Sequence, residues 1–175
     1  EVLALTDHDE VAGLDEAHAA ARETGITLVS GTEVSVTWQG ETIHVVGLRI
    51  DASNRQLDAG LAGVRSGRDS RARRIGEALA AAGIAEAFEG ALAYVTSERL
   101  VSRTHFARFL VEAGHVRDIN EAFRRYLGTG KPGYVPHAWA SLQQAVDWIR
   151  AAGGQAVIAH PGRYKLPEPS MRELL

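Results

Sequence analysis

The sequence has 175 residues, of which 45% are hydrophobic and 23% are charged, and its formal net charge is −3. This is the composition of an ordinary globular domain with a sizeable core, and the charge provides no global field for nucleic acid or an anionic membrane. Because the sequence has no cysteine, disulfides, thiolate metal sites and a cysteine nucleophile are excluded.

No apolar run approaches the roughly 18 residues that a membrane-spanning helix needs, and there is no basic-then-apolar leader. We therefore expect a cytoplasmic protein. The chain opens at Glu1 with a strand already under way, and it closes on SMRELL, which has the pattern of the opening turns of an amphipathic helix. We expect these residues to be the middle of a longer protein.

The first part of the chain predicts the order strand, helix, strand, strand. Residues 2–6 form a short apolar run that ends in turn-forming residues, which indicates a buried strand. The segment GLDEAHAAARETG has helical periodicity, and Gly25 is a typical helix stop. ITLVSGTEVSVTW is rich in β-branched residues, and ETIHVVGLRI alternates so that His44 shares a face with Val46.

The middle of the chain is helical in pattern. Helices are expected over residues 57–82, 104–113 and 119–127, and the segment GTGKPGYVPH is expected to be a loop. Ser141 should cap the helix LQQAVDWIRAAGG, after which QAVIAHPG returns to a buried strand.

This layout predicts an α/β fold whose sheet or barrel is interrupted by an all-helical insertion. We place the barrel in residues 1–53 and 139–175, and the insertion, or cap subdomain, in residues 54–138. About four core strands are visible, whereas a complete (β/α) barrel takes about 250 residues. The barrel is therefore expected to be incomplete in this chain.

Three polar residues lie at or just beyond a predicted strand, namely His8, Glu33 and His160, and His44 lies inside one. Active-site groups of α/β proteins gather at the carboxyl ends of strands, and imidazole and carboxylate together suit zinc, manganese or iron. Each residue alone has an ordinary explanation: TDHD could be a helix-start loop, Glu33 could face solvent and His44 could be a hydrogen-bonded core histidine. Their joint occurrence favours a metal site.

Basic residues of the predicted insertion are candidates for binding phosphate. Arg65, Arg68 and Arg71 share one helix face, and a solvated face of ion pairs is the alternative interpretation. The segment SRTHF places Arg103, Thr104 and His105 at a predicted helix start, where backbone N–H groups favour anions. Lys131, in a glycine-flanked loop, is a further candidate.

Several segments together resemble the PHP (polymerase and histidinol phosphatase) domain family: ALTDHD, GTEVSV, HVVGL and AVIAHPGRY. The resemblance implies a distorted (β/α)7 barrel with a three-metal site that hydrolyses phosphate esters. Two further segments, SRTHFARFLVEAG and GKPGYVPHAWASLQQAVDWI, resemble one branch of that family. Its members are bacterial phosphoesterases that act on 3',5'-nucleoside bisphosphates and on the 5' ends of short RNA.

The resemblance implies roles for the residues of these motifs. His8 matches a ligand of one metal, Glu33 matches the carboxylate that bridges two others, and His44 and His160 match further ligands of one bridged metal. The cofactor would be divalent metal, Mn²⁺ first and Zn²⁺ or Fe²⁺ as alternatives, with up to three ions. Asp7 or Asp9 could orient a ligand or a water.

Two motifs of the family are not found in the chain, a His-x-His and an Asp-x-His, and we expect them before Glu1 and after Leu175. In related enzymes the insertion covers the site and binds a second phosphate. The resemblance carries that role to Arg68, Arg71, Arg103 and Thr104.

The expected function is metal-dependent hydrolysis of the 3'-phosphate of a nucleoside 3',5'-bisphosphate by metal-activated hydroxide. Alternatives are a 5'-3' exonuclease that acts on short 5'-phosphorylated RNA with the same site, a histidinol phosphatase and a non-catalytic PHP scaffold. The expected partners are a small nucleotide or short RNA ends, with no membrane and no stable protein partner.

Overall fold

The computed structural model describes residues 1–95 and 101–175. It divides the chain into two compact units: unit 1 is Glu1–Val64 with Ala138–Leu175, and unit 2 is Arg65–His137. The expected mixed α/β class is confirmed, whereas the (β/α)7 barrel and the subdomain ranges stay predictions. Among the described helices, none is both long enough and apolar enough to cross a bilayer.

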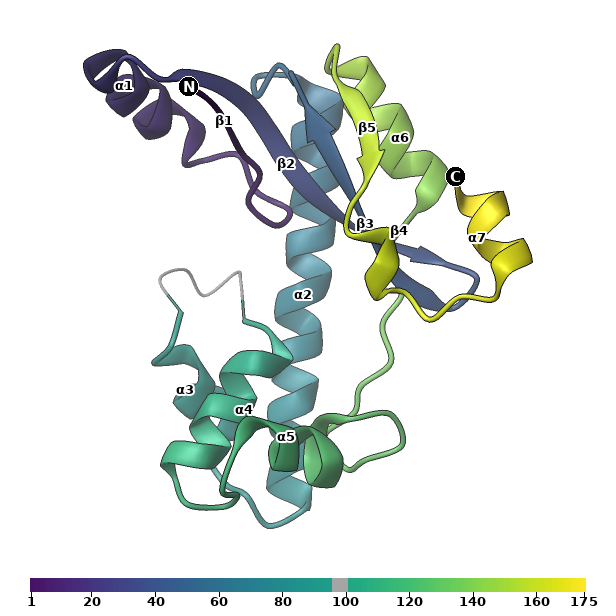
Figure 1. Cartoon of the computed structure of the whole chain (residues 1–175). Helices are drawn as coiled ribbons and strands as arrows, with labels where there is room; N and C mark the ends of the chain where they lie inside the picture. Colours follow the sequence, from purple (N-terminus) through teal and green to yellow (C-terminus); the bar gives the residue numbers. More distant parts are fainter. Residues whose placement is uncertain (96–100) are drawn as a thin grey trace. The chain divides into compact units, whose positions relative to one another are not determined.

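Unit 1 is built on a five-stranded mixed sheet with the order β1-β2-β3-β5, and β4 pairs with β2 (Figure 1). β2 is parallel to β1 and β4, β3 is antiparallel to β2, and β5 is antiparallel to β3. The strands are β1 (Val2–Leu5), β2 (Thr27–Trp38), β3 (Glu41–Leu48), β4 (Ala140–Ser141) and β5 (Gln155–Ile158).

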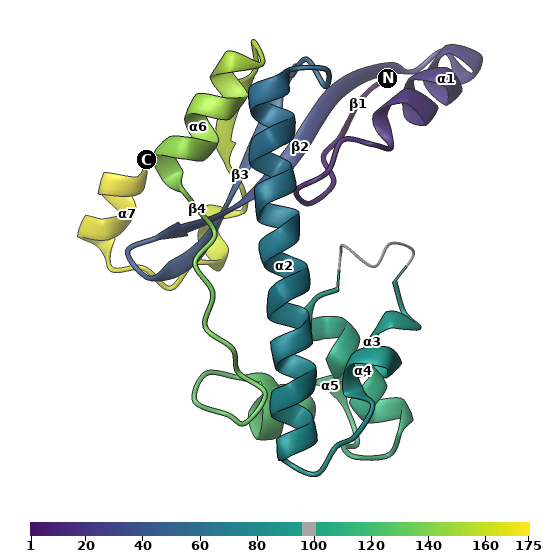
Figure 2. The same cartoon turned by 180° about the vertical axis from the view of Figure 1, so that it is seen from behind.

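Helices cover one face of this sheet. Unit 1 contains α1 (Leu14–Thr24), the start of α2 (Arg55–Ala81), α6 (Leu142–Ala151) and α7 (Glu168–Leu174), with a 3₁₀ turn at Pro161–Arg163. In Figure 2, α6 and the start of α2 lie in front of the strands. Val34 and Val45 of the sheet are buried with Leu61 of α2 and Ile149 of α6. Since side chains alternate along a strand, Glu33 and His44 occupy the opposite face.

The ends of the helices in unit 1 follow from local sequence. Gly25, which follows α1, has a φ of 72°, a left-handed conformation that glycine adopts without steric cost. Ser141 and Gln144 form a reciprocal capping box at the start of α6. These two predictions are confirmed.

Unit 2 is helical and has its own core, which includes Phe106 and Leu110. It holds the rest of α2, then α3 (Ala87–Leu92), α4 (Arg103–Glu112) and α5 (Ile119–Ala122), followed by a π-helical turn at Phe123–Leu127. The single helix expected over residues 119–127 is thus divided. The N–H of Gly128 donates to the carbonyl of Phe123 at 2.8 Å, the i→i−5 bond that widens this last turn.

Candidate metal centre

His8 is held against β2 by the backbone on both sides of it. The N–H of Glu33 donates to the carbonyl of Asp7 at 2.9 Å, and the N–H of Asp9 donates to the carbonyl of Glu33 at 3.0 Å. These two bonds make a parallel bridge between His8 and Glu33, beyond the end of β1. The expectation that the TDHD segment leaves a strand and presents its side chains at the strand's end agrees with this placement.

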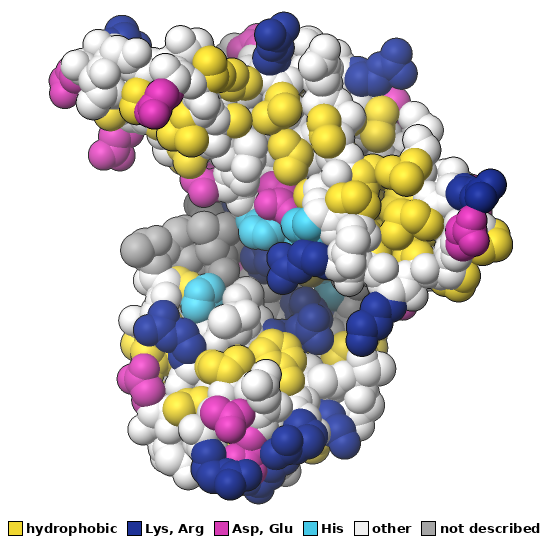
Figure 3. All heavy atoms as spheres, viewed as in Figure 1, with side chains coloured by type: hydrophobic (Ala, Val, Ile, Leu, Met, Phe, Trp, Pro, Cys, Tyr) yellow, Lys and Arg dark blue, Asp and Glu magenta, His cyan; other side chains and the backbone are white. Residues whose placement is uncertain are grey.

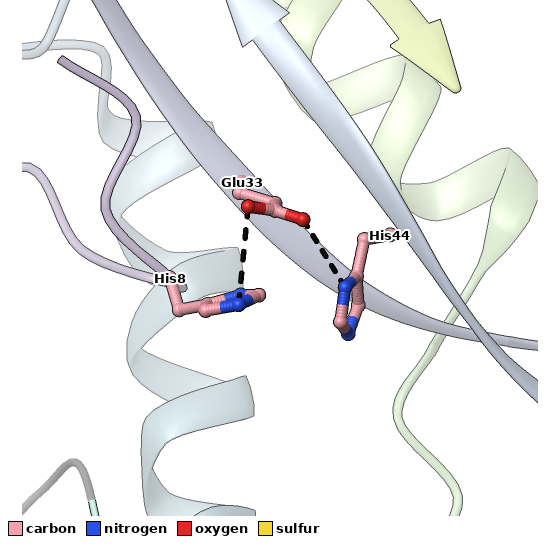
Figure 4. Close-up of side chains that lie close together, drawn as sticks. All are labelled: His8, Glu33 and His44. Atoms are coloured by element: carbon pink, nitrogen blue, oxygen red, sulfur yellow. Dashed lines mark ion pairs between the residues drawn. The ribbon is translucent and has the colours of Figure 1, made fainter. Parts of the chain in front are cut away.

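Glu33 lies between two histidines, with one carboxylate oxygen towards each. Its Oε1 is 3.1 Å from Nδ1 of His44, and its Oε2 is 3.8 Å from Nε2 of His8 (Figure 4). The donor atoms of these three residues all lie within 4.8 Å of one another. β2 supplies Glu33, β3 supplies His44, and the loop after β1 supplies His8.

His160 joins the same carboxylate from the far end of the sequence. Its Nε2 is 3.2 Å from Oε1 of Glu33 and 3.2 Å from Nδ1 of His44. The antiparallel pairing of β3 with β5 brings it there, because Val45 lies opposite Ile158. His160 itself has a left-handed φ of 32° and leads into the turn that starts with Pro161. The structure therefore brings together all four residues that the sequence suggested as ligands.

The four side chains are partly buried but reach solvent. Exposure of the side chain rises from 17% for Glu33 to 46% for His8, and Figure 3 shows histidine and acidic side chains side by side at the surface of unit 1. Burial lowers the pKa of His44, and the neighbouring His8 lowers it further, whereas Glu33 opposes this shift. His44 is thus a neutral imidazole near pH 7, with a lone pair available to a cation.

The donor set fits a divalent metal. Nδ1 of His44 and Nε2 of His160 lie within about hydrogen-bond distance of the same oxygen of Glu33 and of each other, so three donor atoms converge on one point. Within residues 1–95 and 101–175, Nδ1 of His160 is buried and has no hydrogen-bond partner. Three imidazoles and a carboxylate are ligands that zinc, manganese and iron all accept.

Tyr164 is a member of this site that sequence reasoning missed. Its hydroxyl accepts a hydrogen bond of 2.9 Å from the backbone N–H of His44, and its ring centroid is 5.4 Å from that of His160. Burial raises the pKa of Tyr164, so the hydroxyl keeps its proton. Its position just beyond the short turn that follows His160 was the signal in the sequence that could have suggested it.

Asp7 contacts β2 through its backbone, whereas the role expected of its side chain stays a prediction. Its carbonyl accepts from the N–H of Glu33 and, at 3.3 Å, from the hydroxyl of Thr32. The carboxylate that is fully buried next to the site belongs to Asp9.

The arginines suggested as phosphate ligands belong to unit 2, where Arg71 is near Arg68 and Arg103. Nε of Arg71 donates to the carbonyl of Val135 at 3.0 Å. Burial lowers the pKa of Arg71 to about 10, and the charges of Arg103, Arg68 and other arginines contribute. His137, left undecided from the sequence, also belongs here, since burial and then Arg71 lower its pKa.

Three more of the suggested phosphate ligands lie at the start of α4, namely Arg103, Thr104 and His105. The guanidinium of Arg103 lies 5.7 Å from the ring centroid of Phe123 and 6.0 Å from that of Tyr134. Nδ1 of His105 accepts from the N–H of Ser102 at 3.0 Å, so that nitrogen is engaged in capping the helix. Thr104, like Lys131 in the loop further on, is exposed.

No family model matches this chain. It is 53% identical over 174 residues to the 3',5'-nucleoside bisphosphate phosphatase of Chromobacterium violaceum, and 46% identical over the same length to a 5'-3' exoribonuclease of Haemophilus influenzae. These alignments cover 99% of the chain but 61% and 63% of the two relatives, so the chain spans less than two thirds of their length.

Solved structures agree with these relationships. A Chromobacterium violaceum amidohydrolase, determined with sulfate and no metal, superposes with a TM-score of 0.93 at 54% identity, over 99% of this chain and 61% of that one. A Bifidobacterium adolescentis protein assigned as a metal-dependent phosphoesterase superposes with a TM-score of 0.82 at 29% identity, over 98% of this chain and 62% of that one.

Proposed function

We propose that this chain hydrolyses the 3'-phosphate of nucleoside 3',5'-bisphosphates. It belongs to the PHP-type phosphoesterases, in the branch of bacterial 3',5'-nucleoside bisphosphate phosphatases and 5'-3' exoribonucleases. The observation that carries the proposal is the position of Glu33. One of its oxygens faces His8 and the other faces His44 and His160, as a carboxylate shared between two cations requires.

His8, Glu33, His44 and His160 would hold the metal. When bound, divalent metal supplies the positive charge that neutralises a phosphate dianion and lowers the pKa of the water that attacks phosphorus. The chain's own contribution is to hold the carboxylate of Glu33 between the imidazoles. The lowered pKa of His44 also favours metal binding, because a protonated imidazole cannot bind a cation.

We further propose that the arginines of unit 2 bind the second phosphate. Like charges that lower the pKa of Arg71 repel one another, and an anion bound among them would relieve that repulsion. A guanidinium can hold phosphate through two parallel hydrogen bonds, which suits Arg68, Arg71 and Arg103 to the role. Thr104, His105 and Lys131 are further candidates for contacts to the same group.

A second candidate function is 5'-3' exonuclease action on short 5'-phosphorylated RNA. It is favoured by the relatives named for that activity, which include one from Escherichia coli that is 41% identical. The reaction would use the same site on a phosphodiester of the RNA chain, and the leaving atom would again be a ribose oxygen.

The test is phosphate release from adenosine 3',5'-bisphosphate by the full-length protein with added Mn²⁺. Glu33→Gln should abolish it, because an amide cannot supply two anionic oxygens, whereas Glu41→Gln, a matched change at an exposed glutamate of the same sheet, should not. AMP as the other product supports the phosphatase. Degradation of 5'-phosphorylated short RNA without release from the bisphosphate would replace it by the exonuclease. No turnover of either, with no bound metal, would leave a scaffold.

A further inference from the structure

Asp9 is a charged residue with no exposed surface. Its Oδ1 accepts a hydrogen bond of 2.6 Å from the N–H of Ser35, and its Oδ2 accepts one of 2.8 Å from the hydroxyl of the same serine. A buried carboxylate is costly unless it is hydrogen-bonded, so these short bonds are what makes its position tolerable. We call the pair the Asp9–Ser35 clamp.

The backbone of Asp9 is also in an uncommon conformation. Its φ is 54°, in the left-handed region that residues with a Cβ rarely adopt, although aspartate does so more readily than most. The N–H of Asp9 donates to the carbonyl of Glu33, so both main chain and side chain fix the residue. Burial and backbone strain that coincide at one residue, next to His8, are typical of functional sites.

Ser35 connects the clamp to Glu33 and His44. It follows Glu33 by two positions on β2, so the two side chains lie on the same face of the sheet. It is also the residue directly opposite His44 in the register of β2 and β3. One carboxylate thus ties the loop that bears His8 to the strand that bears Glu33, at the point where that strand meets His44.

We propose that the Asp9–Ser35 clamp is a positioning device, which holds His8, Glu33 and His44 at the spacing they need to bind the same cations. The metal part of this inference rests on the proposed function, whereas the positioning part rests on the geometry alone. A contribution to folding only is the competing explanation, and it predicts that metal binding follows stability.

The experiment uses two clamp variants of the full-length protein and one matched control. Asp9→Gly removes the carboxylate while suiting the left-handed backbone, and Ser35→Ala removes the hydroxyl while leaving Asp9 in place. Ile149→Ala, the control, removes a fully buried side chain of α6 that packs on the other face of the sheet. For each protein, Co²⁺ affinity is measured from its visible absorption and stability from the thermal midpoint without metal.

Removing groups that orient metal ligands typically weakens binding about 10- to 100-fold. We expect a loss in this range for Asp9→Gly, a smaller loss for Ser35→Ala and altered Co²⁺ bands for both. Ile149→Ala should lower the midpoint without changing affinity. Clamp variants that bind Co²⁺ like the wild type would overturn the proposal, and so would a control that weakens binding as much as they do. If Asp9→Gly does not fold, Ser35→Ala decides.

A second measurement tests the positioning role independently of metal binding. Ring resonances of His8 and His44 are recorded by NMR without metal, at the same pH for every protein. Shifts in the clamp variants that Ile149→Ala lacks would support positioning, even if the wild type bound no Co²⁺ and the phosphatase proposal failed. Unchanged resonances would overturn positioning, whatever the metal does.

Discussion

Gly60 and Gly63 lie one turn apart on α2, and an added methyl group would meet very different surroundings at the two positions. A Cβ on Gly60 would lie 2.4 Å from Cδ2 of Trp148 and 2.6 Å from two more atoms of its ring. A Cβ on Gly63 would meet nothing within 4 Å. Carbon atoms pack at about 3.5–4.0 Å, so Gly60→Ala forces the helix or the indole to move.

Gly63→Ala should therefore stabilise the protein, whereas Gly60→Ala should be neutral or destabilising. Alanine is favoured over glycine inside a helix by about 1 kcal/mol, which Gly63→Ala should gain in full. Gly60→Ala gains the same amount, but overpacking a core contact costs about 1–3 kcal/mol. Because the helix term cancels between them, their stabilities should differ by about 1–3 kcal/mol, or about 2–12 °C in midpoint for a chain of this size.

Tryptophan fluorescence during urea unfolding is a suitable assay, because all three tryptophans of the sequence, Trp38, Trp139 and Trp148, belong to unit 1. The signal reports unit 1, which contains both glycines. Combining Gly60→Ala with Trp148→Leu should make the alanine at position 60 less harmful than it is beside tryptophan. Equal midpoints for Gly60→Ala and Gly63→Ala would refute the contact between α2 and α6 on which the reasoning depends.

Hydrogen bonds from the N–H and the guanidinium of Arg117 hold the pKa of Glu121 at about 2, below its ordinary 4.5. The ionised carboxylate therefore stabilises the fold above pH 4.5, and this stabilisation is lost as the pH falls towards 2. Glu121→Gln should thus be less stable than the wild type by circular dichroism at pH 6 and similar to it near pH 2; an equal difference at both pH values would contradict this. Tyr164→Phe removes the acceptor of the His44 N–H and should cost about 1 kcal/mol of stability and weaken Mn²⁺ binding by calorimetry, and unchanged values would show that the bond contributes nothing. Arg103→Met should raise KM for the bisphosphate and leave Mn²⁺ affinity unchanged, and a variant with a wild-type KM would remove Arg103 from the substrate site.

The parts of the fold that were predictable are those that depend on neighbours in sequence. β-Branched runs marked β2 and β3, and Gly25 and Ser141 marked helix ends, because φ preferences and capping bonds act within one turn. α3 lacked such a signal: no side chain caps it, and it follows Glu86 in a left-handed conformation. The π-helical turn could not be predicted from the sequence either, since its residues also occur in ordinary α-helices.

Residue types at strand ends indicated which residues could form the site, but not how they meet. His160 and Glu33 lie 127 positions apart, and the pairing of β3 with β5 decides that they touch. The same limit applied to TDHD, where two aspartates looked equivalent. Burial and a positive φ single out Asp9. Its carboxylate is bonded to Ser35 of β2, which is distant from it in sequence, so neither feature could be read from the TDHD segment.

Unit 1 is assembled from two segments of the chain that are separated by the whole of unit 2. During synthesis, His8, Glu33 and His44 leave the ribosome before unit 2, and His160 leaves after it. At about 5–20 residues per second, the ribosome takes about 4–15 s to make the intervening residues, and they are contiguous and can fold first. Until β5 is made, the edge of β3 that pairs with it therefore has no partner, and His160 is the last of the four candidate ligands to be synthesised.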